Sequence, residues 1–259
     1  MAATQNRDMG SGSIPRLLAQ LALPAVVAQV VNLLYNIVDR IYIGHIPGIG
    51  TQALAGIGVA GSLIILISAF SAIVAGGGAP LAAIALGQGN RTHAGKILGN
   101  GFVLLLFFTL LTSGLSYLFM EPILLFSGAS EQTLGYATAY LSIYLIGTLF
   151  VEVSVGLNTF INTQGRPGIA MLSIVIGALL NILLDPLFIF VFDWGVKGAA
   201  LATIISQACS AGWVLFFLTS RRASLRLEPR YMRLDRKVVG AILALGASPF
   251  IMASTESLV

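Results

Sequence analysis

Seven long apolar runs dominate this 259-residue chain and limit what it can fold into. Each run is long enough to cross the roughly 30 Å hydrocarbon core of a bilayer as an α-helix. Hydrophobic residues make up 57% of the chain and charged residues only 9%, whereas soluble domains carry roughly a quarter charged residues. The predicted spans are residues 17–43, 53–85, 97–120, 133–160, 168–192 and 196–219, and a seventh that begins near 238. The expected fold class is an all-α polytopic membrane protein, with a six-helix transmembrane bundle and the start of a seventh helix.

The second predicted span is too long for a simple crossing. Glycine and proline cluster in it between Gly76 and Pro80, and these residues favour helix ends and turns. We therefore expect the helix to end near Gly76 to Pro80, and we expect segment 76–89 to form a helix break and a cytoplasmic turn.

Basic residues gather in alternate connecting segments. Those segments contain Arg7, Arg16, Arg91, Lys96, Arg166, Arg221, Arg222, Arg226, Arg230, Arg233, Arg236 and Lys237. This bias follows the positive-inside rule, so the amino-terminal tail (1–16) and a basic linker (221–237) are expected in the cytoplasm. The rule accounts for the net charge of +4 without a nucleic-acid partner, and it makes the lipid bilayer the main partner.

A weak internal repeat indicates how the chain is organised. Residues 18–34 align with residues 243–259, and the alignment matches Pro24 with Pro249. Transporters are often built from such repeats. The expected domains are therefore a six-helix lobe over 17–220 and, after the basic linker, the truncated start of a second lobe over 238–259.

Motifs for catalysis or cofactor binding are not supported by their context. The sequence GIGVAG (56–61) fits a dinucleotide pattern, but it lies inside an apolar span rather than between a strand and a helix. Cys209 is the single cysteine, and the two histidines have no partner at metal-ligand spacing. We predict that the chain is not an enzyme and binds no cofactor.

Carboxylates inside the predicted spans are the strongest functional signal. They are Asp39, Glu152, Asp185 and Glu256. Each such residue costs at least roughly 2.5 kcal/mol on insertion scales, which makes it a functional candidate by default. Helical rise and topology place Asp39 and Asp185 at one depth in the outer half of the bundle, together with Asn181 and Thr203. Two carboxylates, an amide and a hydroxyl suit a small cation or a shared proton.

Structural explanations also exist for the same residues. Asp39 could form an interfacial ion pair with Arg40, and Asp185 could merely be accommodated where Pro186 loosens the helix. The amide and the hydroxyl could simply join neighbouring helices.

The sequence resembles the multidrug and toxic compound extrusion (MATE) transporters, particularly their DinF-like branch. The resemblance covers the whole chain and combines several segments in a fixed order. These are LALPAVVAQVVNLLYNIVDRIYIG (21–44), GGGAPLAAIALGQGN (76–90), NTFINTQGRP (158–167), NILLDPLFIF (181–190) and GVKGAALATIISQ (195–207).

This resemblance implies two six-helix bundles that export organic cations or drugs by alternating access, in exchange for protons or sodium, in the bacterial inner membrane. It implies ion or proton coupling at Asp39, Asn181, Asp185 and Thr203, with sodium as the one possible metal ion there. It also implies a helix bend at Pro24. The candidate substrate-cavity residues are Tyr35, Asn36, Glu152 and Asn158.

The chain departs from the family in length, because nearly all of the second bundle is missing. One alternative is therefore a half-transporter that works only with a partner, either a separate carboxy-terminal lobe or a second copy. Another is a lipid-linked saccharide flippase of related architecture. A basic cavity is expected for a flippase, and the spans contain only Arg40.

Overall fold

The computed structural model describes residues 14–257, with side chains from residue 22 onward. Within this range the chain is helical and contains no β-strand. Its long helices are α1 (Ile14–Gly44), α2 (Gly50–Ile73), α4 (Arg91–Leu118), α6 (Glu131–Asn162), α7 (Pro167–Pro186), α8 (Gly195–Thr219) and α9 (Arg236–Glu256). Seven helical segments of the described chain are long and apolar enough to cross a membrane, so the predicted fold class is confirmed. Most of the predicted tail (1–16) lies outside the described residues.

Shorter elements complete the chain. They are the π-helical turn η1 (Val74–Gly78), α3 (Ala79–Gly87), α5 (Met120–Phe126), the π-helical turn η2 (Leu187–Val191) and the 3₁₀ turn η3 (Pro229–Tyr231). The sequence did not indicate α5, which lies between the third and fourth spans.

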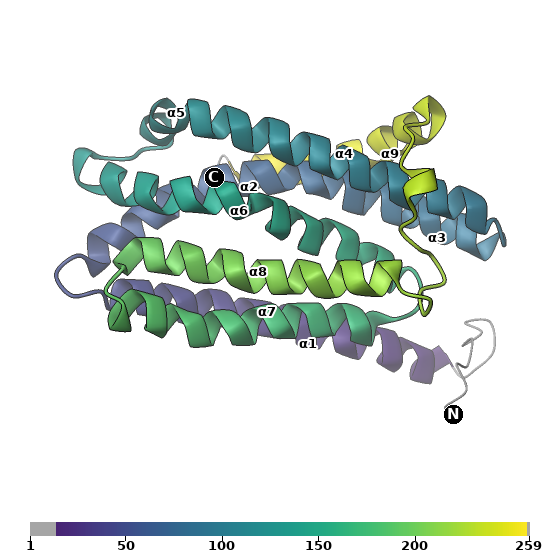
Figure 1. The fold of residues 1–259 in the computed structure, drawn as a ribbon, viewed down its shortest axis with the longest axis horizontal. Helices are drawn as coiled ribbons and strands as arrows, with labels where there is room; N and C mark the ends of the chain where they lie inside the picture. The colour runs from purple at the N-terminus through teal and green to yellow at the C-terminus, as the bar shows by residue number, and fades with distance from the viewer. Residues whose placement is uncertain (1–13, 258–259) are drawn as a thin grey trace.

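Helix α6 holds the bundle together. It packs against α8 on one side and against α2 and α4 on the other. Figure 1 shows the two groups that it joins, with α1, α7 and α8 on one side and α2, α4 and α9 on the other. Helix α1 packs mainly against α7 and is the most exposed of the six bundle helices, with 6% of its span buried.

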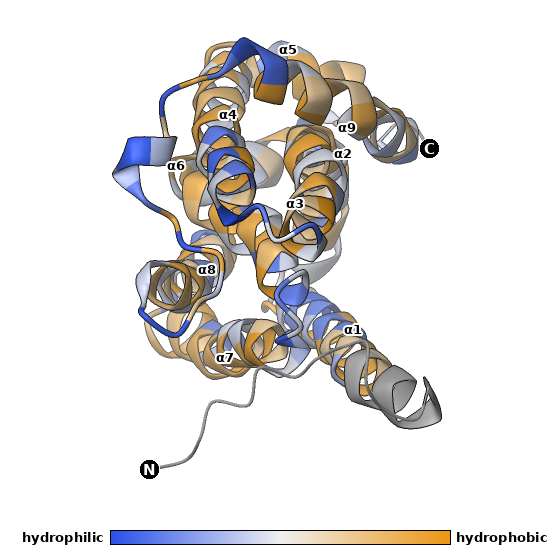
Figure 2. Cartoon of the chain, turned by 90° about the vertical axis from the view of Figure 1, so that its right-hand side faces the viewer, coloured by the Kyte–Doolittle hydropathy of each residue, from blue (hydrophilic) through white to orange (hydrophobic). Residues whose placement is uncertain are grey.

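Apolar side chains cover the outside of the bundle. Phe107, Leu118, Ile146, Leu183 and Phe216 are each more than half exposed. Figure 2 shows hydrophobic colour along the helices, with hydrophilic colour on the connecting segments and on part of α1. Such a surface is stable in lipid, where apolar groups need no shielding and helices satisfy their own backbone groups.

The predicted helix end near Gly76 to Pro80 is wrong. The helix continues from Gly50 to Gly87, and only its winding changes, because η1 replaces α-helical turns over Val74–Gly78. Pro80 then lies in the first turn of α3, where its missing N–H costs least. Only the end of the expected turn is present, at Gln88 and Gly89.

The π-helical turn η1 is also where α9 packs on the bundle. A Cβ atom on Gly77 would lie 2.2 Å from the Ile242 carbonyl oxygen, and a Cβ on Gly246 would lie 2.4 Å from the Ile73 carbonyl oxygen. Both positions therefore require glycine, because any side chain would force the two backbones apart.

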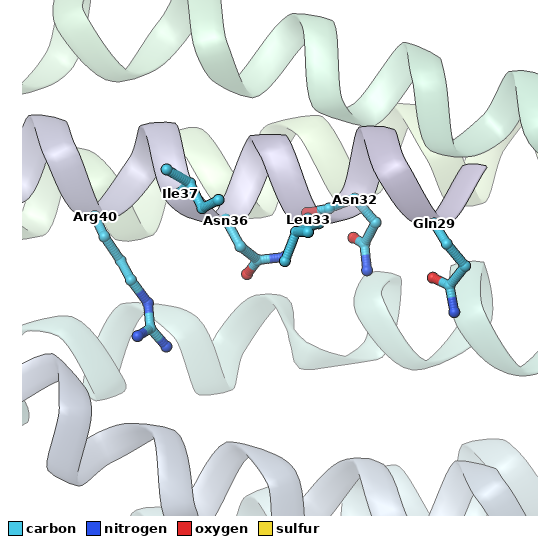
Figure 3. A pocket seen from close by; sticks show the side chains of 6 residues that line it. All are labelled: Gln29, Asn32, Leu33, Asn36, Ile37 and Arg40. Carbon is cyan, nitrogen blue, oxygen red and sulfur yellow. Dashed lines mark hydrogen bonds between the residues drawn. The ribbon is translucent and has the colours of Figure 1, made fainter. Parts of the chain in front are cut away.

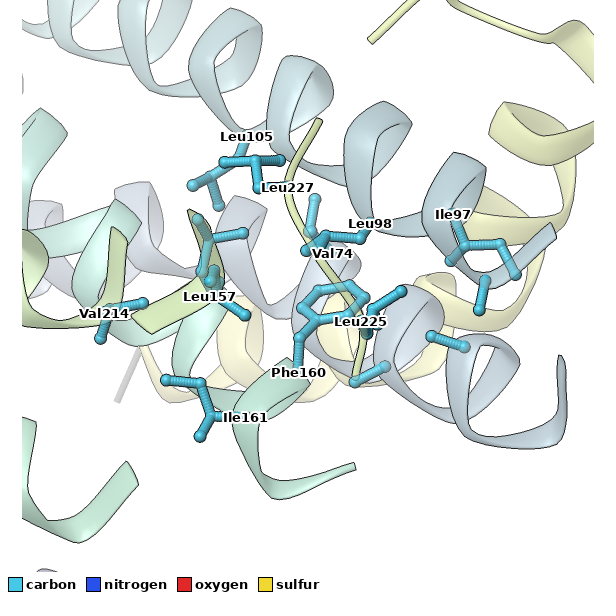
Figure 4. Close-up of a cluster of buried hydrophobic side chains, with 14 of the residues drawn as sticks. Val74, Ile97, Leu98, Leu105, Leu157, Phe160, Ile161, Val214, Leu225 and Leu227 are labelled. Carbon is cyan, nitrogen blue, oxygen red and sulfur yellow. The ribbon is translucent and has the colours of Figure 1, made fainter. Parts of the chain in front are cut away.

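One hydrophobic core lies at the end of the bundle near α3 and the start of α4. Figure 4 shows its centre, where Phe160 and Leu157 of α6 meet Leu98 of α4. Leu225 and Leu227 enter the same core from the α8–α9 connection, and they are 1% and 7% exposed. The predicted basic linker is therefore also a packing element.

We call residues 220–235 the strap, because they are bonded across the bundle. Asn100, fully buried on α4, donates from Nδ2 to the carbonyl oxygens of Tyr231 (3.1 Å) and Arg233 (3.2 Å). Its Oδ1 accepts a hydrogen bond from the Asp235 backbone N–H at 2.7 Å. At the other end, Oε1 of Gln164 accepts a bond from the Leu225 backbone N–H at 3.0 Å. The strap is thus fixed to α4 and α6.

Replacing Asn100 with Ala should release the strap. The substitution removes the side-chain partner of three part-buried backbone groups of the strap, at a cost of up to roughly 1–3 kcal/mol. We expect trypsin to cut after Arg230 and Arg233 several-fold faster than in the unsubstituted chain, measured by mass spectrometry of timed digests. Asn162→Ala, at an exposed position on α6, is the control and should leave the rate unchanged. Equal cleavage in both variants would contradict the role of Asn100.

Candidate functional site

Helix α7 presents two polar residues on the face that meets its neighbours. Asn181 and Asp185 are 1% and 0% exposed and lie one helical turn apart. The Asn181 amide nitrogen donates to Asp185 Oδ1 at 3.2 Å. The same nitrogen lies 3.4 Å from the hydroxyl of Thr203 on α8, and that hydroxyl donates to the Ala199 carbonyl oxygen at 3.0 Å.

Asp39 of α1 completes this group. Its carboxyl lies within side-chain hydrogen-bonding reach of the Asp185 carboxyl, across the contact between α1 and α7. The structure therefore brings together all four residues that the sequence placed at one depth. They come from three helices.

Oxygen atoms in the group lack partners. Asp39 Oδ1, Asp185 Oδ2 and Asn181 Oδ1 are buried and accept no hydrogen bond in the structure. A buried polar atom without a partner costs roughly 1–3 kcal/mol, and a charged one costs more. Two adjacent carboxylates also repel. A proton shared by the carboxyls, or a small cation held by these oxygens, would remove both costs.

The group has no basic partner among the described side chains. The one ion pair in residues 22–257 joins Arg230 to Glu228 at 2.6 Å, on the strap. Arg40 follows Asp39 but is exposed, and its side chain extends into a groove beside α1 (Figure 3). Arg40 therefore acts on the Asp39 carboxyl only at longer range and forms no ion pair with it within 4.0 Å.

The chain after Asp185 changes its winding. Pro186 ends α7, and η2 continues the helix as a π-helical turn to Val191. Proline removes a backbone donor, and short π-helical turns are frequent at functional sites. The loosening expected at Pro186 is therefore present, next to the paired carboxyls.

Three tyrosines line the same region, and sequence reasoning found only Tyr35. Tyr140 and Tyr144 of α6 are 5% and 6% exposed, with stacked rings whose centroids are 5.8 Å apart. Tyr140 lies near Thr203 and Asp39. The four-residue spacing of the two tyrosines was a signal for one helix face, but not for which helix they meet.

The candidate cavity residues lie at different places. Asn36 lines the open groove of about 550 Å³ along α1, which Figure 3 shows with Gln29, Asn32, Leu33, Ile37 and Arg40. Tyr35 is half-buried next to Asp39. Asn158 is buried on α6 and donates to the Ala170 carbonyl oxygen at 3.2 Å. Glu152 is buried between α6 and α2, where Ser68 donates to it at 2.8 Å.

Within the described residues, no three His, Cys, Asp or Glu side chains gather as a metal site. The donor set at Asp39 is instead two carboxyls, an amide and a hydroxyl, which are hard oxygen ligands. Such a set is chemically suited to a proton or a small hard cation. The family resemblance implies a helix bend at Pro24. This residue lies inside α1, which is helical on both sides of it.

The fold and the acidic group between α1 and α7 define a polytopic membrane protein with carboxyl groups in its interior. The model of one family, described as MatE, matches residues 24–187. This match covers more than half of the chain, and the chain therefore belongs to the MatE family. Its members are transporters, which agrees with the expectation that the chain is not an enzyme.

Relatives and solved structures support the assignment. The chain is 24% identical over 240 residues to the multidrug export protein MepA of Staphylococcus haemolyticus (strain JCSC1435), and the match covers 93% of this chain and 53% of MepA. The MepA of Staphylococcus aureus (strain N315) is 24% identical over 260 residues, with 92% and 52% covered. A solved structure described as the outward-facing conformation of a multidrug resistance MATE family transporter superposes with a TM-score of 0.87 at 23% identity, covering 95% and 54%. The chain spans about half the length of the relatives it matches.

Replacing Asp185 with Asn should stabilise the protein at alkaline pH without sodium. Under these conditions both carboxyls ionise and repel, and the substitution removes one buried charge that has no basic partner. We expect a gain of roughly 1–3 kcal/mol, measured as a higher thermal unfolding midpoint in detergent. Acidification should narrow the difference, because a proton bound by the unsubstituted pair also removes the repulsion.

Asp193→Asn is the control for this measurement, because Asp193 lies exposed in the turn after η2. It should leave the midpoint unchanged at every pH. A drop in stability of Asp185→Asn at alkaline pH would instead show that the carboxylate has a stabilising partner.

Proposed function

We propose that this chain forms the amino-terminal lobe of a secondary active exporter, which moves organic cations or drugs out of the cell in exchange for protons or sodium. One observation carries the proposal. The buried carboxyl of Asp185 meets the half-buried carboxyl of Asp39 between α1 and α7, and neither forms an ion pair among the described side chains. The MepA relatives are named multidrug export proteins, which supports the direction of transport.

The coupling ion binds at the paired carboxyls in this proposal. Asp39 and Asp185 supply the charge, while Asn181 and Thr203 supply an amide and a hydroxyl oxygen. Without a bound ion, two carboxylates a few ångströms apart repel by about 4 kcal/mol at an effective dielectric of 20. That energy is enough to shift a two-state equilibrium by about a thousandfold.

Helix α1 links the ion to the drug. It carries Asp39 at the α7 contact and Asn36 on the groove, so a small rotation of α1 changes both places. Tyr35 and Asn158 are further candidate contacts for the cargo. A cationic drug that prefers one position of α1, and an ion that prefers the other, weaken each other's binding equally.

A second six-helix bundle completes the transporter in this proposal, because alternating access needs two halves. That bundle is a carboxy-terminal lobe or a second copy of this chain. The basic strap and amino terminus lie in the cytoplasm, following the positive-inside rule. The bacterial relatives support a place in the plasma membrane.

Replacing Asp39 or Asp185 with Asn should abolish export, because neutral amides neither repel nor bind a proton. The measurement is ethidium efflux, together with drug resistance, in bacteria that lack their own exporters. The chain is expressed alone and together with the second bundle of a related transporter. Efflux by the Asn variants should fall to the level of cells without the protein.

Asp193→Asn again serves as the control, since asparagine tolerates the positive φ of 56° found at this exposed position. It should keep full efflux. Normal efflux by Asp39→Asn or Asp185→Asn, at equal amounts in the membrane, would overturn the proposal.

A further inference from the structure

Glu152 is a second buried carboxyl that the paired site does not use. It lies within α6, about 15 Å along the helix from its end at Asn162, and is 2% exposed. The Ser68 hydroxyl of α2 donates to Glu152 Oε1 at 2.8 Å. Its other oxygen, Oε2, has no partner. One hydroxyl cannot balance a full charge in the middle of a membrane helix.

The contact between α2 and α6 contains a second polar atom without a partner. Ser71, one turn after Ser68, is 3% exposed, and its hydroxyl makes no hydrogen bond. It lies against Gly156, one turn after Glu152, where an added Cβ would be 3.6 Å from the Ser71 Cβ. The two oxygens without hydrogen-bond partners, Glu152 Oε2 and the Ser71 hydroxyl, therefore lie in the same contact between α2 and α6.

No positive charge reaches Glu152 from the helices around it. Helix α2 contains no charged residue, and none of the basic residues of α4, α8 or α9 pairs with Glu152. Those residues are Arg91, Lys96, Lys197, Arg236 and Lys237, each within a few residues of a helix end. On its own helix the nearby titratable group is Tyr144. Asp39, Asp185, Tyr35 and Tyr140 face the paired site.

A metal ion does not fit this position well. Sodium or a divalent cation takes several oxygen ligands, but the orphan atoms here are one carboxyl oxygen and one hydroxyl. A proton needs only the carboxyl itself. It neutralises the charge, and the Ser68 hydroxyl can still donate to the carbonyl oxygen of the neutral group.

We propose that Glu152, held by Ser68, is a proton-binding site in this lobe that is separate from the Asp39–Asp185 pair. The neutral form fits the dry contact between α2 and α6. The charged form draws in water or separates the two helices, so proton loss loosens this contact. The role in transport rests on the proposed antiport, whereas proton binding does not.

Infrared spectroscopy tests the proposal without any transport. The full chain carries Asp39→Asn and Asp185→Asn, which removes the carboxyls of the pair, and is titrated with acid and base in detergent. We expect a carbonyl stretching band of a buried protonated carboxyl, which disappears reversibly on titration to alkaline pH. Adding Glu152→Gln should abolish the band. Adding Glu131→Gln, at an exposed position in the first turn of the same helix, should leave it unchanged.

Ser68→Ala provides an independent variant, because it removes the one hydrogen bond that the Glu152 side chain accepts from the described residues and keeps the carboxyl. The band should persist at a shifted frequency, in protein whose helical circular dichroism is normal. Absence of the band at every pH, its persistence in Glu152→Gln, or its loss on adding sodium at constant pH would each overturn the proposal. Failure of drug export with the band intact would overturn only the proposed function.

Discussion

The hydrocarbon interior requires every backbone group to be bonded within its own helix, and the rest of the structure depends on this constraint. Prolines challenge it, because they cannot donate a backbone bond, and Pro24, Pro186 and Pro249 lie inside long helices while Pro80 lies in the first turn of α3. Beside two of them the winding changes to a π-helical turn rather than a break, at η1 before Pro80 and at η2 after Pro186. Helix α9 packs on the glycines of η1, whereas η2 begins two residues after Asp185. The same local solution thus builds a helix contact and borders the acidic group.

Charge distribution in this bundle is unusual for a structural core. Side chains that stabilise a fold normally satisfy one another. Here Asp39, Asp185 and Glu152 each keep an oxygen without a partner. The described basic residues lie near the ends of the bundle or on the strap, except for exposed Arg40. The interior is therefore short of positive charge, which is the basis for proposing that protons or small cations bind there.

The carboxyl group at α1 and α7 could be predicted because an acidic residue in an apolar span is rare and carries depth information. Thr203 followed from the same estimate of depth. Tyr140 and Tyr144 could not be predicted, because tyrosine is ordinary in membrane helices and its neighbours are set by helix rotation. The helix end near Gly76 was mispredicted. Glycine and proline cluster where a helix ends in a turn and also where its winding changes to a π-helical turn, so the sequence did not distinguish the two structures. The strap was predicted to be a linker because it contains many arginines. Leu225 and Leu227, on either side of Arg226, were the signal that it packs on the bundle.

The hydrogen bonds of Asn100 to the strap also hold the start of α9 in place. They fix the chain as far as Asp235. The Asp235 side chain caps the first turn of α9 by accepting a hydrogen bond from the Lys237 backbone N–H at 3.0 Å. The first turn of α9 is therefore held at the strap. The close contact at Gly77 and Gly246 holds the same helix at a second point further along. A helix held at two points cannot slide along the bundle or turn about its own axis without breaking one of the two contacts.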